Sequence, residues 1–528
     1  MFKKASYILL LKLVLFSLAP FHVQAAVISP DLQSALATSE GTEHFPVIIR
    51  LSEKAGLKGH QEGSRKCHRS KVIKALKQTA EITQKSLRSF LRQEGIEPVV
   101  PLWIINGLAL HAQPAVIRKL AERPEIESIR LNKTLQVPRM SRDDWLPLAW
   151  NMNAIRAPEV WELGYSGQGI VVANMDTGVD IHHPDLRGQW RGGPNSWFDA
   201  YGKYHLPFDR DGHGTQSMGI MVGGDGSGVG IGLAPKAQWI AVRIFDDDGE
   251  ASSTAIHQGF QWLLDPDGNP ETDDAPDIVN NSWGLEEKTG QCLLEFRDDI
   301  QALKTAGIAV IFSAGNEGPL PSSNISPANY PEIFSVGSVD RSLMVTNFSS
   351  RGPSACDGSI FPQAVAPGVS IRTSDTTFGI TFSNPYTSVS GTSFASAHAA
   401  GVMALLMSAF PQLPVSDLES ALKQSALDLG PSGADHSYGY GLIDCFEAYT
   451  YLVHNSADKI NDSDGDGFTS GCDCNDHDPT MYPGAPEIKD DGIDQDCNGY
   501  DLTIHITRAV YRRWWKRGLL KVEAASSL

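Results

Sequence analysis

Residues 390–401 have the sequence SGTSFASAHAAG, and they decide how the rest of the chain is interpreted. Small and apolar residues continue from there to Phe410, which predicts a buried helix with Ser393 in its first turn. The first turn of a helix offers free backbone N–H groups and the positive end of the helix dipole. Both would stabilise an oxyanion beside a serine, so Ser393 is a candidate nucleophile, although helices of small residues usually serve packing alone.

Two upstream stretches supply partners for this serine. Residues 170–180, IVVANMDTGVD, predict a buried strand whose carboxyl end presents Asp176. Residues 211–215, DGHGT, predict a loop that enters a helix at His213. Either residue alone would be an ordinary capping or surface group. Together with Ser393 they are the carboxylate, imidazole and hydroxyl that acyl transfer by serine requires.

The order of the three residues separates the families that use them. Asp, then His, then Ser is the subtilisin order, and residues 391–395, GTSFA, lack the last glycine of the G-x-S-x-G motif of α/β-hydrolases. The chain resembles the subtilisin-like serine proteases, or subtilases, over roughly residues 150–451. The resemblance rests on DTG at 176–178, HGT at 213–215, SAGN at 313–316 and GTS at 391–393. VNNSWG at 279–284 and IAVRIF at 240–245 are similar to the bacillopeptidase F-like subgroup.

The segment 148–451 contains the candidate triad and is the expected catalytic domain, and apolar strands alternate there with helical stretches. This alternation predicts an α/β fold, a parallel sheet with helices on both faces and the site where strand ends meet. The expected strands are 169–175, 239–244, 277–281, 308–312 and 334–338, and the expected helices are 254–264, 295–306 and 393–410.

The resemblance also implies further site residues. On its local sequence Asn316 predicts a turn, because Glu and Gly follow it. In the family its position is the oxyanion-hole amide, which donates together with the Ser393 backbone N–H. Two sets of residues match the family's substrate-binding positions. The walls of the P1 pocket match Ser282, Trp283, Gly284, Ala314 and Gly315. The edge segment that pairs with an extended peptide matches residues 228–232, with Gly228 and Gly230.

Composition and charge limit the partners. A chain of 528 residues with 41% apolar and 20% charged residues predicts a globular protein of more than one domain. The net charge of −18 argues against nucleic acid as a partner. Seven cysteines are compatible with a few disulfides in an oxidising compartment.

The N-terminal residues 1–25 predict an export signal. Lys3 and Lys4 precede an apolar run over 7–18, and Val23-Gln24-Ala25 has the small-residue cleavage pattern. The run is short for a bilayer span, so no stable membrane anchor is expected. The protein is predicted to be secreted, extracellular or periplasmic in transit.

Residues 43–138 predict a small α+β domain. Strands are expected at 45–51, 103–110 and 126–131, with helices at 71–92 and 115–122. The domain resembles the inhibitory propeptide of subtilases, which implies a zymogen whose own propeptide is its inhibitor and ends in the active site like a product. Cleavage is expected between residues 135 and 148. The alternative is an independent domain that stays attached.

The composition changes after Tyr451, and residues 455–503 predict a loop-rich calcium-binding repeat. Residues 462–468, DSDGDGF, place acids at alternate positions before a glycine, as in an EF-hand loop. The expected metal ligands are Asp462, Asp464, Asp466 and Asp473. Oxygen-rich chemistry favours Ca²⁺ over zinc, and Ca²⁺ is expected here as a structural cofactor. The segment resembles a metal-binding repeat of secreted bacterial proteins. The alternative is an acidic linker.

Two further segments complete the predictions. Asp185, with the loop 224–230, matches part of a calcium site of the family, and the sequence does not decide whether this site binds calcium. Residues 504–528 predict a β-hairpin or the start of a β-domain.

The chain as a whole predicts a secreted serine endopeptidase that acts on proteins or peptides. The alternatives are an inactive surface or adhesion protein that binds through the calcium repeat, and an esterase with the same triad.

Overall fold

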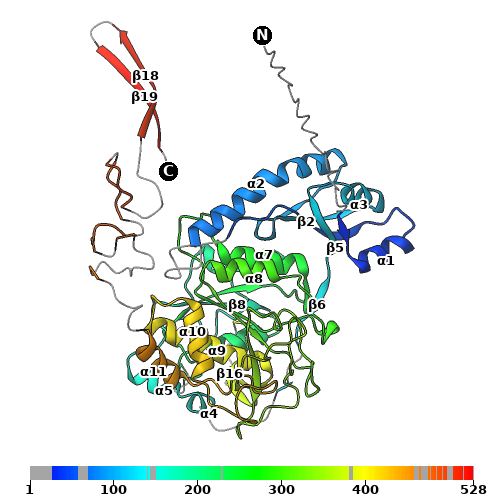
Figure 1. The fold of residues 1–528 in the computed structure, drawn as a ribbon, viewed down its shortest axis with the longest axis vertical. Coiled ribbons are helices and arrows are strands. Elements are labelled where there is room, and N and C mark those ends of the chain that lie inside the picture. Colours follow the sequence, from blue (N-terminus) through cyan, green and yellow to red (C-terminus); the bar gives the residue numbers. More distant parts are fainter. Residues whose placement is uncertain are drawn as a thin grey trace, which may run out of the picture.

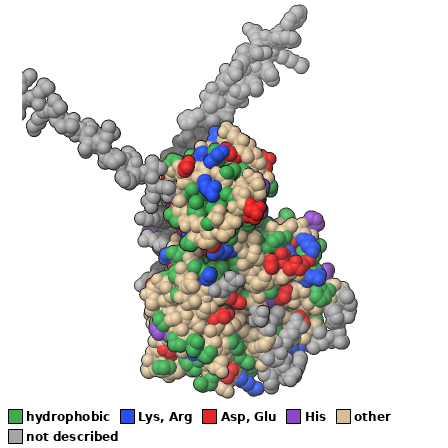
Figure 2. Space-filling model, turned by 90° about the vertical axis from the view of Figure 1, so that its right-hand side faces the viewer, with side chains coloured by type: hydrophobic (Ala, Val, Ile, Leu, Met, Phe, Trp, Pro, Cys, Tyr) green, Lys and Arg blue, Asp and Glu red, His purple; other side chains and the backbone are tan. Residues whose placement is uncertain are grey.

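The computed structural model describes residues 26–57, 69–138, 141–142, 150–226, 230–379 and 385–456, short pieces between 463 and 495, and the backbone of 504–514 and 517–526. The predicted export signal lies outside the described residues. Figure 1 shows an α/β unit that carries a smaller N-terminal unit on one side. In Figure 2 the smaller unit is a separate rounded mass seated on the larger one, with basic and acidic side chains on both.

A parallel sheet forms the centre of the larger unit. Its strands are β8 (Val171–Asp176), β9 (Trp197–Asp199), β10 (Gln238–Arg243), β12 (Ile278–Asn281), β13 (Ala309–Ser313), β14 (Phe334–Val339) and β15 (Ala364–Pro367). They lie in the order β15-β14-β13-β12-β8-β10-β9, and every neighbouring pair is parallel. This confirms the predicted fold class. Only the short edge strands β9 and β15 were not predicted, since three or four residues show little periodicity.

Helices cover both faces of this sheet. The helices α6 (His213–Val222) and α9 (Thr392–Ala409) lie on one face, and α7 (Ser253–Leu264) and α8 (Arg297–Thr305) on the other. Successive strand residues point to opposite faces. Val172 therefore belongs to the core under α6 and α9, while its neighbour Ala173 belongs to the core under α7 and α8. Burial on both faces explains the near-continuous apolar sequence of these strands.

The remaining elements of the larger unit are peripheral. They are α4 (Trp150–Ala154), α5 (Ala157–Glu162), α10 (Val415–Gln424), α11 (Cys445–Asn455), β11 (Glu250–Ser252), β16 (Ile371–Ser374) and β17 (Tyr386–Ser390). A disulfide joins Cys292 to Cys356. Within the described ranges one helix, α9, is long and apolar enough to span a membrane, and 89% of it is buried in the protein interior.

The N-terminal unit is a five-stranded sheet with three helices. The sheet contains β1 (Val27–Ile28), β2 (Phe45–Leu51), β3 (Val100–Leu102), β4 (Gly107–Ala112) and β5 (Ile126–Leu131), in the order β1-β5-β2-β4-β3, and the helices are α1 (Pro30–Thr38), α2 (Arg69–Gln93) and α3 (Pro114–Ala121). Val47 and Ile49 pack in the unit's own core, whereas Ile48 packs in the core shared with α7 and α8. The sheet is thus buried on one face by its own helices and on the other by the larger unit.

One predicted strand of this unit is wrong. The chain over 103–110 is interrupted by a 3₁₀ turn, Trp103–Ile105, and by Asn106, whose φ is 46°. An asparagine tolerates this left-handed backbone, and here its Nδ2 donates to the Glu53 carbonyl oxygen at 2.9 Å. The turn separates β3 from β4, which then pair with each other. The sheet also includes β1, and α1 follows it, both upstream of the expected start at residue 43.

The last described elements are β18 (Ile504–Trp514) and β19 (Arg517–Ser526). They pair antiparallel, which confirms the predicted hairpin. Of the four predicted calcium ligands, Asp462, Asp466 and Asp473 lie outside the described residues, and Asp464 lies within them.

Candidate active site

Asp176 and His213 form a buried hydrogen-bonded pair at the carboxyl end of the sheet. Asp176 is the last residue of β8, and His213 is the first of α6. The His213 Nδ1 lies 2.8 Å and 3.0 Å from the two carboxylate oxygens of Asp176. Because Nδ1 donates its hydrogen bond to Asp176, the neutral imidazole carries its free lone pair on Nε2. Nε2 is buried and has no hydrogen-bond partner among the described residues.

The charge of Asp176 changes the basicity of His213. Burial alone would disfavour the imidazolium, but the Asp176 carboxylate outweighs this and raises the pKa of His213 above its ordinary value of 6.5. An imidazole with a raised pKa is a stronger base, as proton abstraction from a serine hydroxyl requires.

Asp209 holds the helix end that carries His213. Its carboxylate accepts hydrogen bonds from the backbone N–H of Gly212 at 2.9 Å and of Thr215 at 2.8 Å, and from the Thr215 hydroxyl at 2.6 Å. These are N–H groups that a helix start leaves without intrahelical partners. Burial raises the pKa of Asp209 to about 6. The sequence analysis missed this residue, because Asp209 lies four positions before the helix start, outside the N-cap position that signals a helix.

Ser393 is the second residue of α9 and is 3% exposed. Its carbonyl oxygen accepts from the Ser282 hydroxyl at 3.1 Å and from the Ser396 hydroxyl at 2.8 Å. Helices α6 and α9 pack side by side, and the His213 ring lies 5.8 Å from the ring of Phe394, the residue after Ser393. The structure thus brings the three predicted triad residues to one end of the sheet.

Asn316 follows β13 and reaches the same helix start. Its Oδ1 accepts from the backbone N–H of Thr392 at 3.0 Å and from the Thr392 hydroxyl at 2.9 Å. With Oδ1 held in this way, the Nδ2 amide is the end of the side chain that is available to donate. The anchored Oδ1 is bonded to Thr392, the residue before Ser393, whose backbone N–H is the second donor of the expected oxyanion hole.

A chain of buried hydrogen bonds connects α6 to α9 through the sheet. Asn174 Nδ2 donates to the Gly214 carbonyl oxygen at 3.0 Å, and Asn280 Nδ2 donates to Asn174 Oδ1 at 3.0 Å. Asn280 Nδ2 also lies 2.9 Å from the Ser282 hydroxyl, which in turn donates to Ser393. Sequence reasoning missed Asn174 and Asn280, whose signal is a polar residue inside an apolar strand.

The residues predicted to form the walls of the P1 pocket lie in three different places. Ser282 supports the Ser393 backbone, and the side chains of Trp283 and Ala314 are buried in the core under α7 and α8. Gly284 and Gly315 come together at Ile325: a Cβ on either would lie 2.4 Å or 2.9 Å from Ile325 Cδ1. Gly315 also has a φ of 100°, which favours glycine, whereas a Cβ at position 284 would require the end of the Ile325 side chain to move.

An extended segment already lies on an edge strand of the larger unit. Residues Thr134–Gln136, strand β6, pair antiparallel with β11, and the Val137 N–H donates to the Gly249 carbonyl oxygen at 2.8 Å. The expected edge was 228–232. Gly230 instead follows α6 in a loop where Ile231 bonds back to Gly224, and Gly228 lies outside the described residues. Sequence reasoning missed β11, because a three-residue strand shows no clear alternation.

Asp185 does connect with the loop 224–230. One carboxylate oxygen accepts from the Gly226 N–H at 2.5 Å, and the other accepts from the Tyr386 hydroxyl at 2.8 Å. Protein donors thus occupy both oxygens.

Comparison with known proteins gives the same assignment. The model of the subtilase family matches residues 167–441, and a model of a metal-binding motif, Cu-binding MopE, matches residues 473–501. Bacillopeptidase F of Bacillus subtilis is 35% identical over 452 residues, 78% of this chain, and the chain spans 30% of that relative's length. Subtilisin DY of Bacillus licheniformis is 32% identical over 291 residues, 55% of this chain and 94% of that protein.

A third relative, the minor extracellular protease Epr of Bacillus subtilis, is 30% identical over 300 residues, 56% of this chain and 40% of that protein. The family match spans more than half of the 528 residues and includes all three triad positions. The chain therefore belongs to the subtilase family.

Proposed function

We propose that this protein is a serine endopeptidase that cleaves peptide bonds through an acyl-enzyme. The observation that carries the proposal is the buried Asp176–His213 pair with its free Nε2, at the helix start that bears Ser393. In the reaction the Ser393 hydroxyl attacks the peptide carbonyl carbon, and His213 Nε2 takes the hydroxyl proton. Asn316 Nδ2 and the Ser393 N–H donate to the oxyanion, and His213 returns the proton to the leaving amine. Water then hydrolyses the acyl-enzyme by the same steps.

Phenylmethylsulfonyl fluoride tests this assignment. It should label Ser393 alone and abolish the hydrolysis of casein, with the modified residue located by mass spectrometry of the digested protein. A protein that hydrolyses simple esters but not casein would be an esterase. A protein that is not labelled and hydrolyses neither would favour an inactive binding protein.

The N-terminal unit is, in this proposal, the inhibitory propeptide of a zymogen. Two features support it: β6 occupies the edge strand β11 as an extended peptide would, and the apolar face containing Ile48 is covered by the larger unit. Basic residues of the N-terminal unit also meet acids of α8 and its preceding loop, as in the pairs Arg50–Asp298 at 2.9 Å and Arg130–Glu295 at 2.8 Å.

Export to an oxidising compartment is the second part of the proposal. It is supported by the disulfide between Cys292 and Cys356, since such bonds persist mainly in secreted and periplasmic proteins. The name of one relative, an extracellular protease, agrees with it.

The C-terminal acidic region is proposed to bind calcium. Its support is the match of residues 473–501 to a metal-binding motif and the acidic loop at 462–468. Metal that binds only the folded form stabilises it by mass action. EDTA should therefore increase cleavage by added trypsin between residues 452 and 501, and calcium should reverse this. Cleavage sites that do not change between EDTA and calcium would favour an acidic linker.

A further inference from the structure

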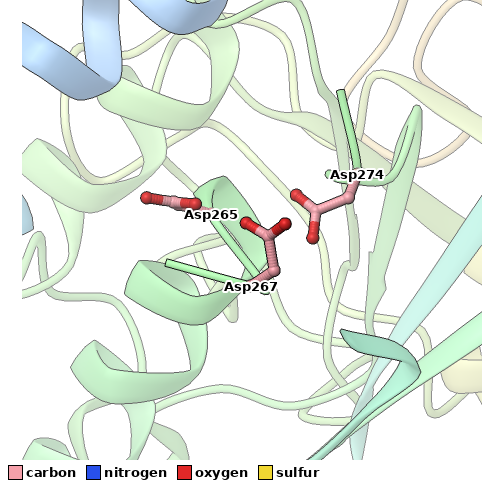
Figure 3. A group of neighbouring side chains, drawn as sticks. All are labelled: Asp265, Asp267 and Asp274. Atoms are coloured by element: carbon pink, nitrogen blue, oxygen red, sulfur yellow. The ribbon is translucent and has the colours of Figure 1, made fainter. Parts of the chain in front are cut away.

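The loop that follows α7 concentrates negative charge at one place. Residues 265–274 have the sequence DPDGNPETDD and lead towards β12. Ligand oxygens of Asp265, Asp267 and Asp274 all lie within 4.8 Å of one another. Figure 3 shows the Asp267 carboxylate between those of Asp265 and Asp274. Three carboxylates at this separation repel one another unless a cation lies among them.

Asp265 marks the buried side of this group. It is 6% exposed, and its Oδ1 is buried without a hydrogen-bond partner among the described residues. Buried carboxylate oxygens in proteins almost always accept a hydrogen bond or bind a cation. Figure 3 shows the Asp265 carboxylate beside that of Asp267, so the carboxylate that carries the unpartnered oxygen belongs to the acidic group.

A cation from the N-terminal unit already reaches this group. The Lys77 ammonium, on α2, forms a salt bridge with Asp265 Oδ2 and donates to the Gly268 carbonyl oxygen at 2.8 Å. This single ammonium charge faces three carboxylates. Lys77 therefore shows where a positive charge sits and leaves the group only partly neutralised.

The other two carboxylates of the group, those of Asp267 and Asp274, are held in place by contacts that do not involve Lys77. Asp267 accepts from the Asn269 N–H at 2.8 Å and from the Thr272 hydroxyl at 2.9 Å. Asp274 accepts from Asn195 Nδ2 at 3.0 Å. These contacts fix the carboxylates while leaving lone pairs for a further ligand.

We propose that Asp265, Asp267 and Asp274, with the carbonyl oxygen of Gly268, form a calcium site that the Lys77 ammonium occupies while the N-terminal unit is docked. All donors are oxygens, and no His or Cys belongs to the group, which favours a hard cation. Calcium accepts six to eight oxygens in irregular geometry, so water would complete the shell. The timing rests on the proposed removal of the N-terminal unit, but the site itself requires only that Lys77 leave.

The same loop meets two more cations of α2. Lys74 pairs with Glu271 at 2.7 Å, and Arg69 pairs with Asp273 at 2.7 Å. Loss of the N-terminal unit would thus remove three positive charges from one loop at once. Calcium would restore two of them, and it would compete with renewed docking of α2.

The experiment uses the full-length chain with Ser393→Ala, so that the N-terminal unit remains attached. Bound calcium is counted by equilibrium dialysis for this parent, for Lys77→Gln and for Lys77→Gln/Asp267→Asn. Lys77→Gln should bind one more calcium per chain than the parent, and Asp267→Asn should remove it. Lys74→Gln is the matched control: it removes the same charge from the same helix but leaves the carboxylate group untouched, so its count should equal the parent's.

The comparison separates this site from the other proposals. Calcium bound in the C-terminal region contributes equally to every variant and cancels. Equal counts in Lys77→Gln and the parent would overturn the site, and so would a gain in Lys74→Gln or a gain that survives Asp267→Asn. The mass of the parent reports separately whether it is processed, and thermal unfolding in EDTA verifies that each variant is folded.

Discussion

Replacing Ser393 by alanine should lower peptide hydrolysis about 10⁶-fold and leave the precursor at full length. The hydroxyl is the only group at this helix start that the mechanism uses as a nucleophile, and the removal of the N-terminal unit is expected to be the protein's own cleavage. Turnover of a chromogenic peptide and the intact mass of the purified protein measure the two effects.

Ser408→Ala is the matched control for this change. Ser408 lies near the other end of α9, where its hydroxyl donates to the Leu405 carbonyl oxygen at 2.8 Å. It should keep both hydrolysis and processing. A Ser393→Ala protein that is still processed in pure form, or that still hydrolyses the peptide, would contradict the assigned nucleophile.

Asp176→Asn should lower kcat about 10⁴-fold and change the pH profile of the residual activity. His213 acts as a base only when it is neutral, so activity falls as pH drops through its pKa. Asp176 raises that pKa, which places the acid limb of kcat/KM above pH 6.5 in the native protein. Without the carboxylate charge, the limb should move to lower pH.

The buried pair His257–Asp299 provides the control for this experiment. Its nitrogen–oxygen distance is 3.0 Å, much like that of the catalytic pair, but it joins α7 to α8 on the opposite face of the sheet. Asp299→Asn should lower stability and leave the acid limb in place. An acid limb that stays fixed in Asp176→Asn would show that Asp176 does not set the basicity of His213.

The candidate catalytic residues were predictable because each is part of a short local pattern. Asp176 ends an apolar strand, His213 begins a helix between glycines, and Ser393 sits in the first turn of a helix of small residues. Parallel strands bring their carboxyl ends to one edge of the sheet. The order of these patterns along the chain therefore predicted that the three candidate residues lie together. The strand positions were also predictable from a local pattern, because a strand that is buried on both faces has a long apolar run in its sequence.

Contacts between distant segments were decided by tertiary structure alone. The pairing of β6 with β11 involves two three-residue strands more than a hundred residues apart, and neither has a periodicity of its own. The Asn174–Asn280 bond depends on β8 and β12 being neighbours. Lys77 meets Asp265 only because α2 docks against the end of α7. The sequence by itself thus determined the fold class and the candidate chemistry, which local patterns encode. Tertiary structure decided which surface charges meet and which edge is covered, because those contacts arise only when separate elements pack together.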